Sequence, residues 1–247
     1  MHESNRMRKI WLLGLFLLTA CAGPSRATPA STPVILDVAL TPSMRPFTET
    51  LHTCAGVHSG FLINVYETPA SELENQTADL VIRLGGTPGN GYAAPVREES
   101  LVLIVNASNP VLTIPVEKIR DIFLGRITSW VEVGGEQQLV QVWVYPDGDD
   151  AREILDTAIF PGDSLTPDAL IAPNPQAMLE AVGDDPFAIG YVPQTWLMQA
   201  HRAEQVHTLN IDQKLVVKLH QSILALSSDE PEGSLRQLLV CMQSAGR

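Results

Sequence analysis

Hydroxyl-bearing residues and glycines gather at three places in the first half of the chain where an apolar run gives way to a polar turn. These junctions are Thr41-Pro42-Ser43, the stretch from Thr68 to Ser71, and Gly85-Gly86-Thr87. Hydroxyl groups and the free N–H groups of a helix N-terminus are donors that bind anions. One such junction is usually an ordinary helix cap. Three of them predict a shared polar cleft beyond the carboxyl ends of the strands, with Thr41, Ser43, Thr68, Ser71, Gly86 and Thr87 as its candidate residues.

Two adjacent acids, Asp149 and Asp150, stand just before Arg152 at the start of a predicted helix. Such acids commonly cap a helix, because its N-terminus favours negative charge. An acid pair can also ligate a metal ion, but pairs of this kind are far more often caps or solvated faces. Arg152 either contacts a ligand in the cleft or pairs with the nearby acids. We expect neither a metal ion nor a cofactor at this pair.

Catalytic motifs are missing from the sequence. There is no H-E-x-x-H pair, no G-x-S-x-G elbow and no phosphate-binding P-loop. The histidines after the N-terminal segment are scattered: His52, His58, His201, His207 and His220. The sequence predicts a binding protein rather than an enzyme, with no catalytic residues.

Composition narrows the class of protein further. The chain has 247 residues, of which 45% are hydrophobic and 18% charged, so it can bury a core. Its formal net charge of −12 gives it no general attraction for nucleic acid phosphates. Three cysteines without a C-x-x-C spacing exclude a zinc ribbon, an iron–sulfur protein and a disulfide-dense miniprotein.

The N-terminal segment is predicted to be an export signal. Basic residues precede the uncharged run Ile10–Ala20, which at eleven residues is too short to cross a bilayer as a helix. Met7 is as good a start as Met1. The run ends in Leu-Thr-Ala-Cys at Cys21, which resembles the bacterial lipobox, so residues 1–20 are expected to be removed and Cys21 to be lipidated. Residues 21–33 are rich in Pro, Ser, Thr and Ala and predict a tether. This predicts a lipid-anchored protein outside the cytoplasm, on the cell surface or in the periplasm.

Two further cysteines, Cys54 and Cys241, remain in the mature chain. In an oxidising compartment they could form a disulfide. They could equally be two buried thiols, because spacing along the chain does not place two sulfur atoms within bonding distance.

Short apolar runs alternate with helical patterns along the mature chain, which favours an α/β fold with mostly parallel strands. The predicted strands are 34–40, 61–66, 80–84, 101–105, 139–145 and 187–192, with another apolar run at 222–226. The predicted helices lie near 44–54, after Ser71, after Pro115, at 151–159, at 175–182, and over the C-terminal residues from Leu235 to Met242.

The segment from Asn109 to Gly135 carries a distinctive signature. Asn109-Pro110 is followed by IFLGRITSW at Ile122–Trp130 and then by a Gly-Gly turn. This pattern resembles the phosphate-type periplasmic binding proteins, which are the substrate-binding lipoproteins of ABC importers. Two shorter matches support the resemblance, Ala78-Asp79-Leu80 and the later AIGYV run that begins at Ala188.

The resemblance implies a type II periplasmic-binding-protein fold, with two α/β lobes, a central ligand cleft and a hinge. Lobe one would comprise residues 34–105 and 197–247, and lobe two residues 106–196. The implied partners are a small polar solute, such as an oxyanion, and a membrane permease with its ATPase. Trp196, near the expected return to lobe one, could report lobe closure.

The anion-binding motif of the family is altered in this chain. After the strand that matches Gln141–Tyr145, the family usually has an arginine and then Ser-Gly-Thr at the start of a helix, which donate hydrogen bonds to the oxyanion. Here Pro146 replaces the arginine, and Asp149-Asp150-Ala151 replaces Ser-Gly-Thr, while Arg152 matches the family. The resemblance thus implies that Asp149, Asp150 and Arg152 line the ligand cleft. A carboxylate about 4 Å from a phosphate oxygen repels it by about 4 kcal/mol at an effective dielectric of 20.

These departures leave two functions open. The first is a phosphate-binding-protein-like solute-binding protein of an ABC importer, whose ligand is either phosphate, if the two acids point away from the cleft, or a solute with a cationic or hydroxyl-rich end. The alternative is a binding-protein-like lipoprotein without a transport role, acting as a sensor or a protein-interaction module.

Overall fold

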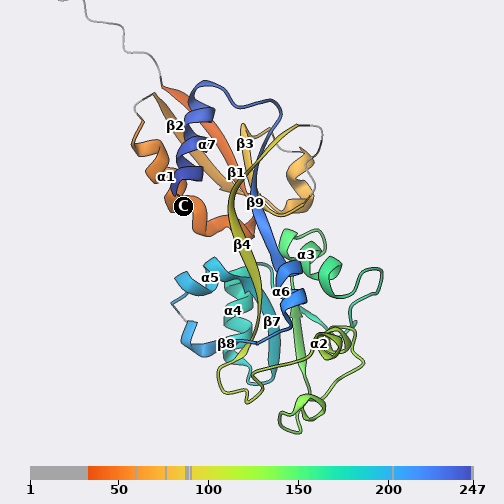
Figure 1. Cartoon of the computed structure of the whole chain (residues 1–247). Coiled ribbons are helices and arrows are strands. Elements are labelled where there is room, and N and C mark those ends of the chain that lie inside the picture. The colour runs from red at the N-terminus through yellow and green to blue at the C-terminus, as the bar shows by residue number, and fades with distance from the viewer. Residues whose placement is uncertain are drawn as a thin grey trace, which may run out of the picture. The chain divides into compact units, whose positions relative to one another are not determined.

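The computed structural model describes residues 33–58, 60–75, 77–86, 89, 91–201 and 203–245 (Figure 1). The expected signal peptide, Cys21, all but the last residue of the tether, and Thr87 lie outside these residues. No helix in the described ranges is long and apolar enough to span a membrane.

The first lobe is built on a sheet in which β1 lies between β2 and β3, while β9 and the first half of β4 extend the sheet beyond β3. The strands are β1 (Val34–Leu40), β2 (Phe61–Glu67), β3 (Leu80–Leu84), β4 (Tyr92–Asn106) and β9 (His220–Ser227). β1 pairs with β2 and with β3 in parallel, so these three strands end at the same edge. The polar turns that follow them are thereby brought to one side of the sheet.

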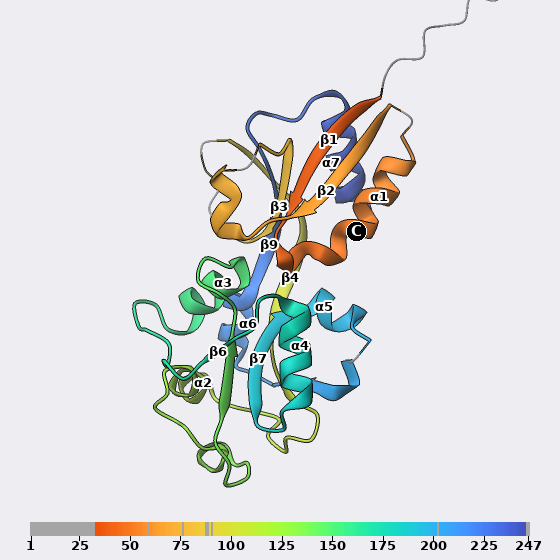
Figure 2. The same ribbon diagram turned by 180° about the vertical axis from the view of Figure 1, so that it is seen from behind.

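Helices α1 (Thr48–Gly56) and α7 (Gly233–Ala245) pack against each other in the first lobe (Figure 2). Leu51 and Leu238 are buried from these two helices, because each presents its apolar stripe to the core. A disulfide joins Cys54 of α1 to Cys241 of α7, with Cα atoms 5.7 Å apart. The bridge ties together two segments separated by 187 residues. Two short 3₁₀ helices, Pro42–Phe47 and Ala70–Asn75, follow β1 and β2.

The second lobe is built around the second half of β4, which pairs with β7 and β8. Its other strands are β5 (Gln141–Val144), β6 (Leu170–Ile171), β7 (Ala188–Pro193) and β8 (Val206–Thr208). Its helices are α2 (Val116–Phe123), α3 (Asp150–Ile159), α4 (Pro175–Asp184), α5 (Gln194–Gln199) and α6 (Gln213–Leu219). β5 pairs in parallel with both β6 and β7, as the alternating pattern predicts. The pairs β3–β9, β4–β7, β4–β8 and β4–β9 are antiparallel, so the expectation of a mostly parallel sheet is wrong at its centre.

The chain passes between the lobes along β4 and β9, which lie side by side in Figures 1 and 2. β4 pairs with β9 over Tyr92–Ser100 and with β7 over Leu101–Val105, so it belongs to both lobes. The expected return to lobe one at residue 197 is too early. β8 still pairs with the end of β4, and α6 packs on α3, so the chain returns only at β9. The pairing of β8 with β4 keeps this stretch in the second lobe.

The signature segment is part of the packing of the second lobe. Trp130 is buried, and its Nε1 donates to the carbonyl oxygen of Phe187 at 2.8 Å. A capping box between Ser129 and Glu132 begins the 3₁₀ helix Trp130–Val133. A Cβ atom at Gly135 would lie 3.0 Å from the Trp130 Cβ, so the Gly-Gly turn lets the backbone pass close to this ring.

Candidate functional site

Two donors of the first lobe meet at the carboxylate of Asp150. Thr41 directly follows β1, and its Oγ1 donates to Asp150 Oδ2 at 2.5 Å. The backbone N–H of Leu84, the last residue of β3, donates to the same oxygen at 2.9 Å. Because β1 and β3 are parallel neighbours, their ends lie at one edge and both donors reach one acceptor. The contacts join the strand ends of one lobe to a helix of the other.

Asp150 is the first residue of α3, and it is fully buried. Its second oxygen, Oδ1, accepts a hydrogen bond from the backbone N–H of Ala151 at 2.9 Å. The free N–H groups of a helix N-terminus favour a negative charge at this point. The carboxylate therefore has three neutral donors, one from its own helix and two from the opposite lobe.

Asp149 caps the same helix, and its Oδ1 accepts a hydrogen bond from the backbone N–H of Arg152 at 3.1 Å. Its side chain is almost completely buried. Burial and the adjacent charge of Asp150 raise the pKa of Asp149 to about 7, although hydrogen bonds from the backbone N–H groups of Arg152 and Ala151 favour its ionised form. Two acids, one of them titrating near neutral pH, thus stand at the lobe junction.

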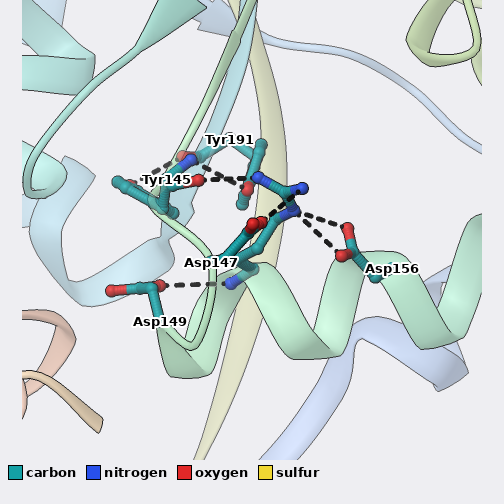
Figure 3. A network of polar contacts seen from close by, with 6 residues as sticks. Tyr145, Asp147, Asp149, Asp156 and Tyr191 are labelled. Atoms are coloured by element: carbon teal, nitrogen blue, oxygen red, sulfur yellow. Dashed lines mark hydrogen bonds and ion pairs between the residues drawn. The ribbon is translucent and has the colours of Figure 1, made fainter. Parts of the chain in front are cut away.

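Arg152 contacts Tyr145, Asp147 and Asp156 of the second lobe, and these three partners are labelled in Figure 3. Its Nε lies 2.8 and 2.9 Å from the two carboxylate oxygens of Asp156, and its Nη1 donates to the carbonyl oxygen of Tyr145 at 2.7 Å. Its Nη2 lies 3.1 Å from Asp147 Oδ1. Of the two roles expected for Arg152, these contacts match the pairing with nearby acids. The guanidinium anchors the turn that precedes α3.

Tyr145 and Tyr191 hold the other side of that turn. The Tyr145 hydroxyl donates to the carbonyl oxygen of Tyr191 at 2.9 Å, and the Tyr191 hydroxyl accepts from the Tyr145 backbone N–H at 3.2 Å. The two rings meet edge to face. Burial raises the pKa of both phenols well above its ordinary value, so they stay neutral and serve as hydrogen-bonding groups.

The other predicted cleft residues do not all lie at the junction between the lobes. Ser43 and Thr68 are buried, and Ser71 lies beside the turn before α3, where a Cβ atom at Gly148 would come within 2.8 Å of the Ser71 Cβ. Gly86 lies apart from them, at a cavity of about 550 Å³ between the lobes that is also lined by Glu153, Lys218 and Gln221. Thr87 is outside the described residues. The structure thus places Thr41, Ser71, Asp149 and Asp150 at one lobe junction, and Gly86 beside it.

Several contacts between the lobes were not predicted from the sequence. Trp196 of α5 donates its Nε1–H to the carbonyl oxygen of Ser43 at 2.9 Å, and Arg45 stacks over the Trp196 ring at 5.4 Å. On the far side of α3, Arg83 Nη2 lies 3.1 Å from Glu153 Oε2. The carbonyl oxygen of Ser43 and the backbone N–H of Leu84 cannot be recognised as contact groups from the sequence, because nearly every residue carries both groups. Of these residues, the sequence points only to Trp196, as a reporter of lobe closure.

No cluster of three or more His, Cys, Asp or Glu side chains in the described part of the chain is arranged to hold a metal ion. The donors around Asp150 are a hydroxyl and two backbone N–H groups, which are suited to an anion and not to a cation. Asp149 and Asp150 therefore act as a helix cap and a buried acceptor in this arrangement.

Comparison with known proteins identifies the fold. The model of the PBP superfamily domain matches residues 90–230. A Clostridium perfringens structure, described as a putative phosphate ABC transporter substrate-binding protein with bound phosphate, superimposes with a TM-score of 0.74 at 17% identity, over 84% of this chain and 92% of that one.

Two further structures extend the comparison. An ABC-type phosphate transport receptor from Vibrio cholerae gives a TM-score of 0.65 at 16% identity, over 85% and 93% of the two chains. The regulatory domain of Synechocystis CcmR, in complex with 2-PG, gives 0.64 at 14% identity, over 86% and 97%. The similar proteins are thus binding proteins and a regulatory domain that share one two-lobe fold. The chain belongs to the PBP superfamily and has the two-lobe α/β fold of the phosphate-binding proteins.

Proposed function

We propose that this chain is an extracytoplasmic, lipid-anchored solute-binding protein of an ABC importer, and that its solute is not a free oxyanion. Membership of the PBP superfamily supports the binding role. The export signal, the lipobox at Cys21 and the Pro-rich segment that follows support the anchor. A small polar solute and a membrane permease are the proposed partners.

One observation carries the exclusion of phosphate. The buried carboxylate of Asp150 already accepts the hydrogen bonds of Thr41 and Leu84, and Asp149 stands next to it. An oxyanion at this point would face charge repulsion of about 4 kcal/mol from each ionised carboxylate within 4 Å. A cationic or hydroxyl-rich solute that lies beside the two carboxylates, and not among the donors that Asp150 occupies, would face no such charge repulsion.

A thermal-shift screen of residues 34–247 tests this proposal. The panel comprises phosphate, sulfate, molybdate, polyamines, amino acids and sugars, each compared with a chloride salt of equal ionic strength. A solute at 100 times its Kd stabilises the folded protein by about 2.7 kcal/mol, which raises the Tm of a domain of this size by roughly 5–10 °C. We expect such a shift with a cationic or polyol solute and none with phosphate. A saturable shift with phosphate would refute the proposal.

A second candidate function is a sensor or protein-interaction module without a transport role. It is favoured by the direct contacts between the lobes, which hold them together without a solute: Thr41 with Asp150, Arg83 with Glu153, and Trp196 with Ser43. Small-angle X-ray scattering separates the two functions. A radius of gyration that falls when a solute from the screen is added supports the transport receptor, and a radius that no solute changes supports the module.

The lipid anchor gives a separate prediction. Replacing Cys21 with Ala removes the only thiol at the lipobox, so the protein should move from the membrane pellet to the supernatant after cell fractionation. Cys54→Ala/Cys241→Ala is the matched control, because it removes cysteines that lie outside the lipobox, and it should stay in the pellet. A Cys21→Ala protein that still needs detergent for extraction would contradict the anchor.

A further inference from the structure

We infer that the Asp150 carboxylate is a built-in ligand that fills an oxyanion site between the lobes, and that vacating it opens a site for a tetrahedral oxyanion such as sulfate or phosphate. This inference goes beyond the proposed function, because it does not depend on which solute the wild-type protein carries. It concerns what the donors at the lobe junction can hold.

The donors around Asp150 form an anion site contributed by both lobes. Thr41 Oγ1 and the Leu84 backbone N–H converge on Oδ2 at 2.5 and 2.9 Å, and the Ala151 backbone N–H reaches Oδ1 at 2.9 Å. The Thr41 side chain and Asp150 are both fully buried. A hydroxyl and two backbone N–H groups, out of water at a helix N-terminus, are the kind of donors that bind carboxylate, sulfate and phosphate oxygens alike.

A second observation is a buried hydroxyl, in the same turn as Thr41, without a hydrogen-bond partner among the described residues. Ser43, two residues after Thr41 in the same turn, is buried, and its Oγ has no hydrogen-bond partner within the described part of the chain. An unpaired buried hydroxyl costs about 1–3 kcal/mol. An ion with four oxygens offers acceptors on several sides, whereas the carboxylate of Asp150 presents only two oxygens.

The tethered carboxylate excludes a free anion from this site in the wild-type protein. Asp150 is held in place by α3, so it competes as an intramolecular group and loses no translational freedom on binding its donors. A free ion loses translational freedom when it binds, and it is also repelled by the charges of Asp149 and Asp150. The lobes are therefore bridged by a group that belongs to the chain itself.

Isothermal titration with sodium sulfate and sodium phosphate tests the inference on residues 34–247. The variant Asp149→Asn/Asp150→Gly empties the site, keeps an N-cap and removes the second charge. The matched control Asp149→Asn/Asp150→Asn removes the same charges but leaves the site filled by an amide, whose oxygen can accept from Thr41 and Leu84. We expect the emptied variant to bind both anions at least about tenfold more tightly than the control and the wild type, a difference of about 1.4 kcal/mol. Equal affinity of the two variants would overturn the inference.

Stability measurements cover the case in which the emptied variant is too unstable for titration. Removing Asp150 leaves the Thr41 hydroxyl and the Leu84 N–H unpaired, so Asp149→Asn/Asp150→Gly should unfold at a lower temperature than the control. Sulfate should restore its Tm, measured by circular dichroism, more than sodium chloride of equal ionic strength does, and should shift the control and the wild type much less. An equal response of all three proteins to sulfate would mean a general salt effect and would also overturn the inference.

Discussion

Replacing Asp149 with Asn should stabilise the protein above neutral pH and leave it almost unchanged in acid. The pKa of Asp149 is raised from 3.8 to about 7 in the folded protein, by burial first and by the charge of Asp150 second. A raised carboxyl pKa means that the folded state binds the proton more tightly than the unfolded state, so stability is lost as the pH rises from about 4 to about 7. At 1.36 kcal/mol per pKa unit this loss is about 4 kcal/mol. Asn keeps the N-cap and carries no charge.

The measurement is the free energy of urea unfolding of residues 34–247 at pH 4 and pH 8. We expect the variant to exceed the wild type by about 3 kcal/mol at pH 8, after a small loss of favourable interaction with the helix N-terminus, and to equal it near pH 4. Asp147→Asn is the control on the same turn: its carboxyl pairs with Arg152, but the side chain is 95% exposed, so the change should be small at both pH values. A variant no more stable than the wild type at pH 8 would show that the ionised carboxylate of Asp149 does not destabilise the folded protein.

Removing the disulfide should cost more than any single change at the junction. The bridge closes a loop across 187 residues of sequence, and the chain-entropy relation gives about 5 kcal/mol for a loop of that length. We expect Cys54→Ala/Cys241→Ala to unfold roughly 10–20 °C below the oxidised wild type in calorimetry. The loss should come mainly from the freer unfolded chain, because α1 and α7 keep their apolar packing.

Reduction provides the control for this prediction. The wild type with a reducing agent should unfold near the temperature of the double variant, and the variant itself should not respond to the reducing agent. Mass spectrometry of the untreated wild type should find no thiols after alkylation. Two alkylated cysteines, or a Tm difference within about 2 °C, roughly the effect of 1 kcal/mol or less, would contradict a structural role for the bridge.

Elements with a strong local apolar pattern could be predicted from the sequence. The strands β1 at Val34–Leu40 and β3 at Leu80–Leu84 have the predicted bounds, and α2 begins directly after Pro115. Mainly apolar runs bounded by turn residues, and a proline at the start of a helix, fix such elements locally. These elements also carry Thr41 and Leu84, so the strand ends that position the junction were predictable.

The first half of β4 could not be predicted in the same way. It contains Pro95 and adjacent charges at Arg97, Glu98 and Glu99, which are depleted in strands. Pairing with β9 makes it a strand, and Glu99 is buried there because it accepts from Ser100 and Thr195. β9 and Thr195 are distant from this segment in sequence, so no local pattern reports them. For the same reason, no local pattern shows that the chain stays in the second lobe through β8 and returns to the first lobe only at β9.

The candidate site was predictable in its composition but not in its connections. The replacement of Ser-Gly-Thr by Asp149-Asp150-Ala151 showed that the anion motif had changed. The sequence could not show that Asp150 turns back to the strand ends, because one of its partners is the backbone N–H of Leu84. It also left two roles for Arg152, between which only the contacts with Asp147, Asp156 and Tyr145 decide.

If the Asp150 carboxylate fills the anion position between the lobes, it should stay there at a high anion concentration. A crystal structure of residues 34–247, grown in or soaked with concentrated ammonium sulfate, tests it most directly. The result we predict is Asp150 Oδ2 within hydrogen-bond distance of Thr41 Oγ1 and the Leu84 N–H, with no ion between them. Tetrahedral density held by Thr41 and Leu84, with the Asp150 side chain turned away, would contradict it.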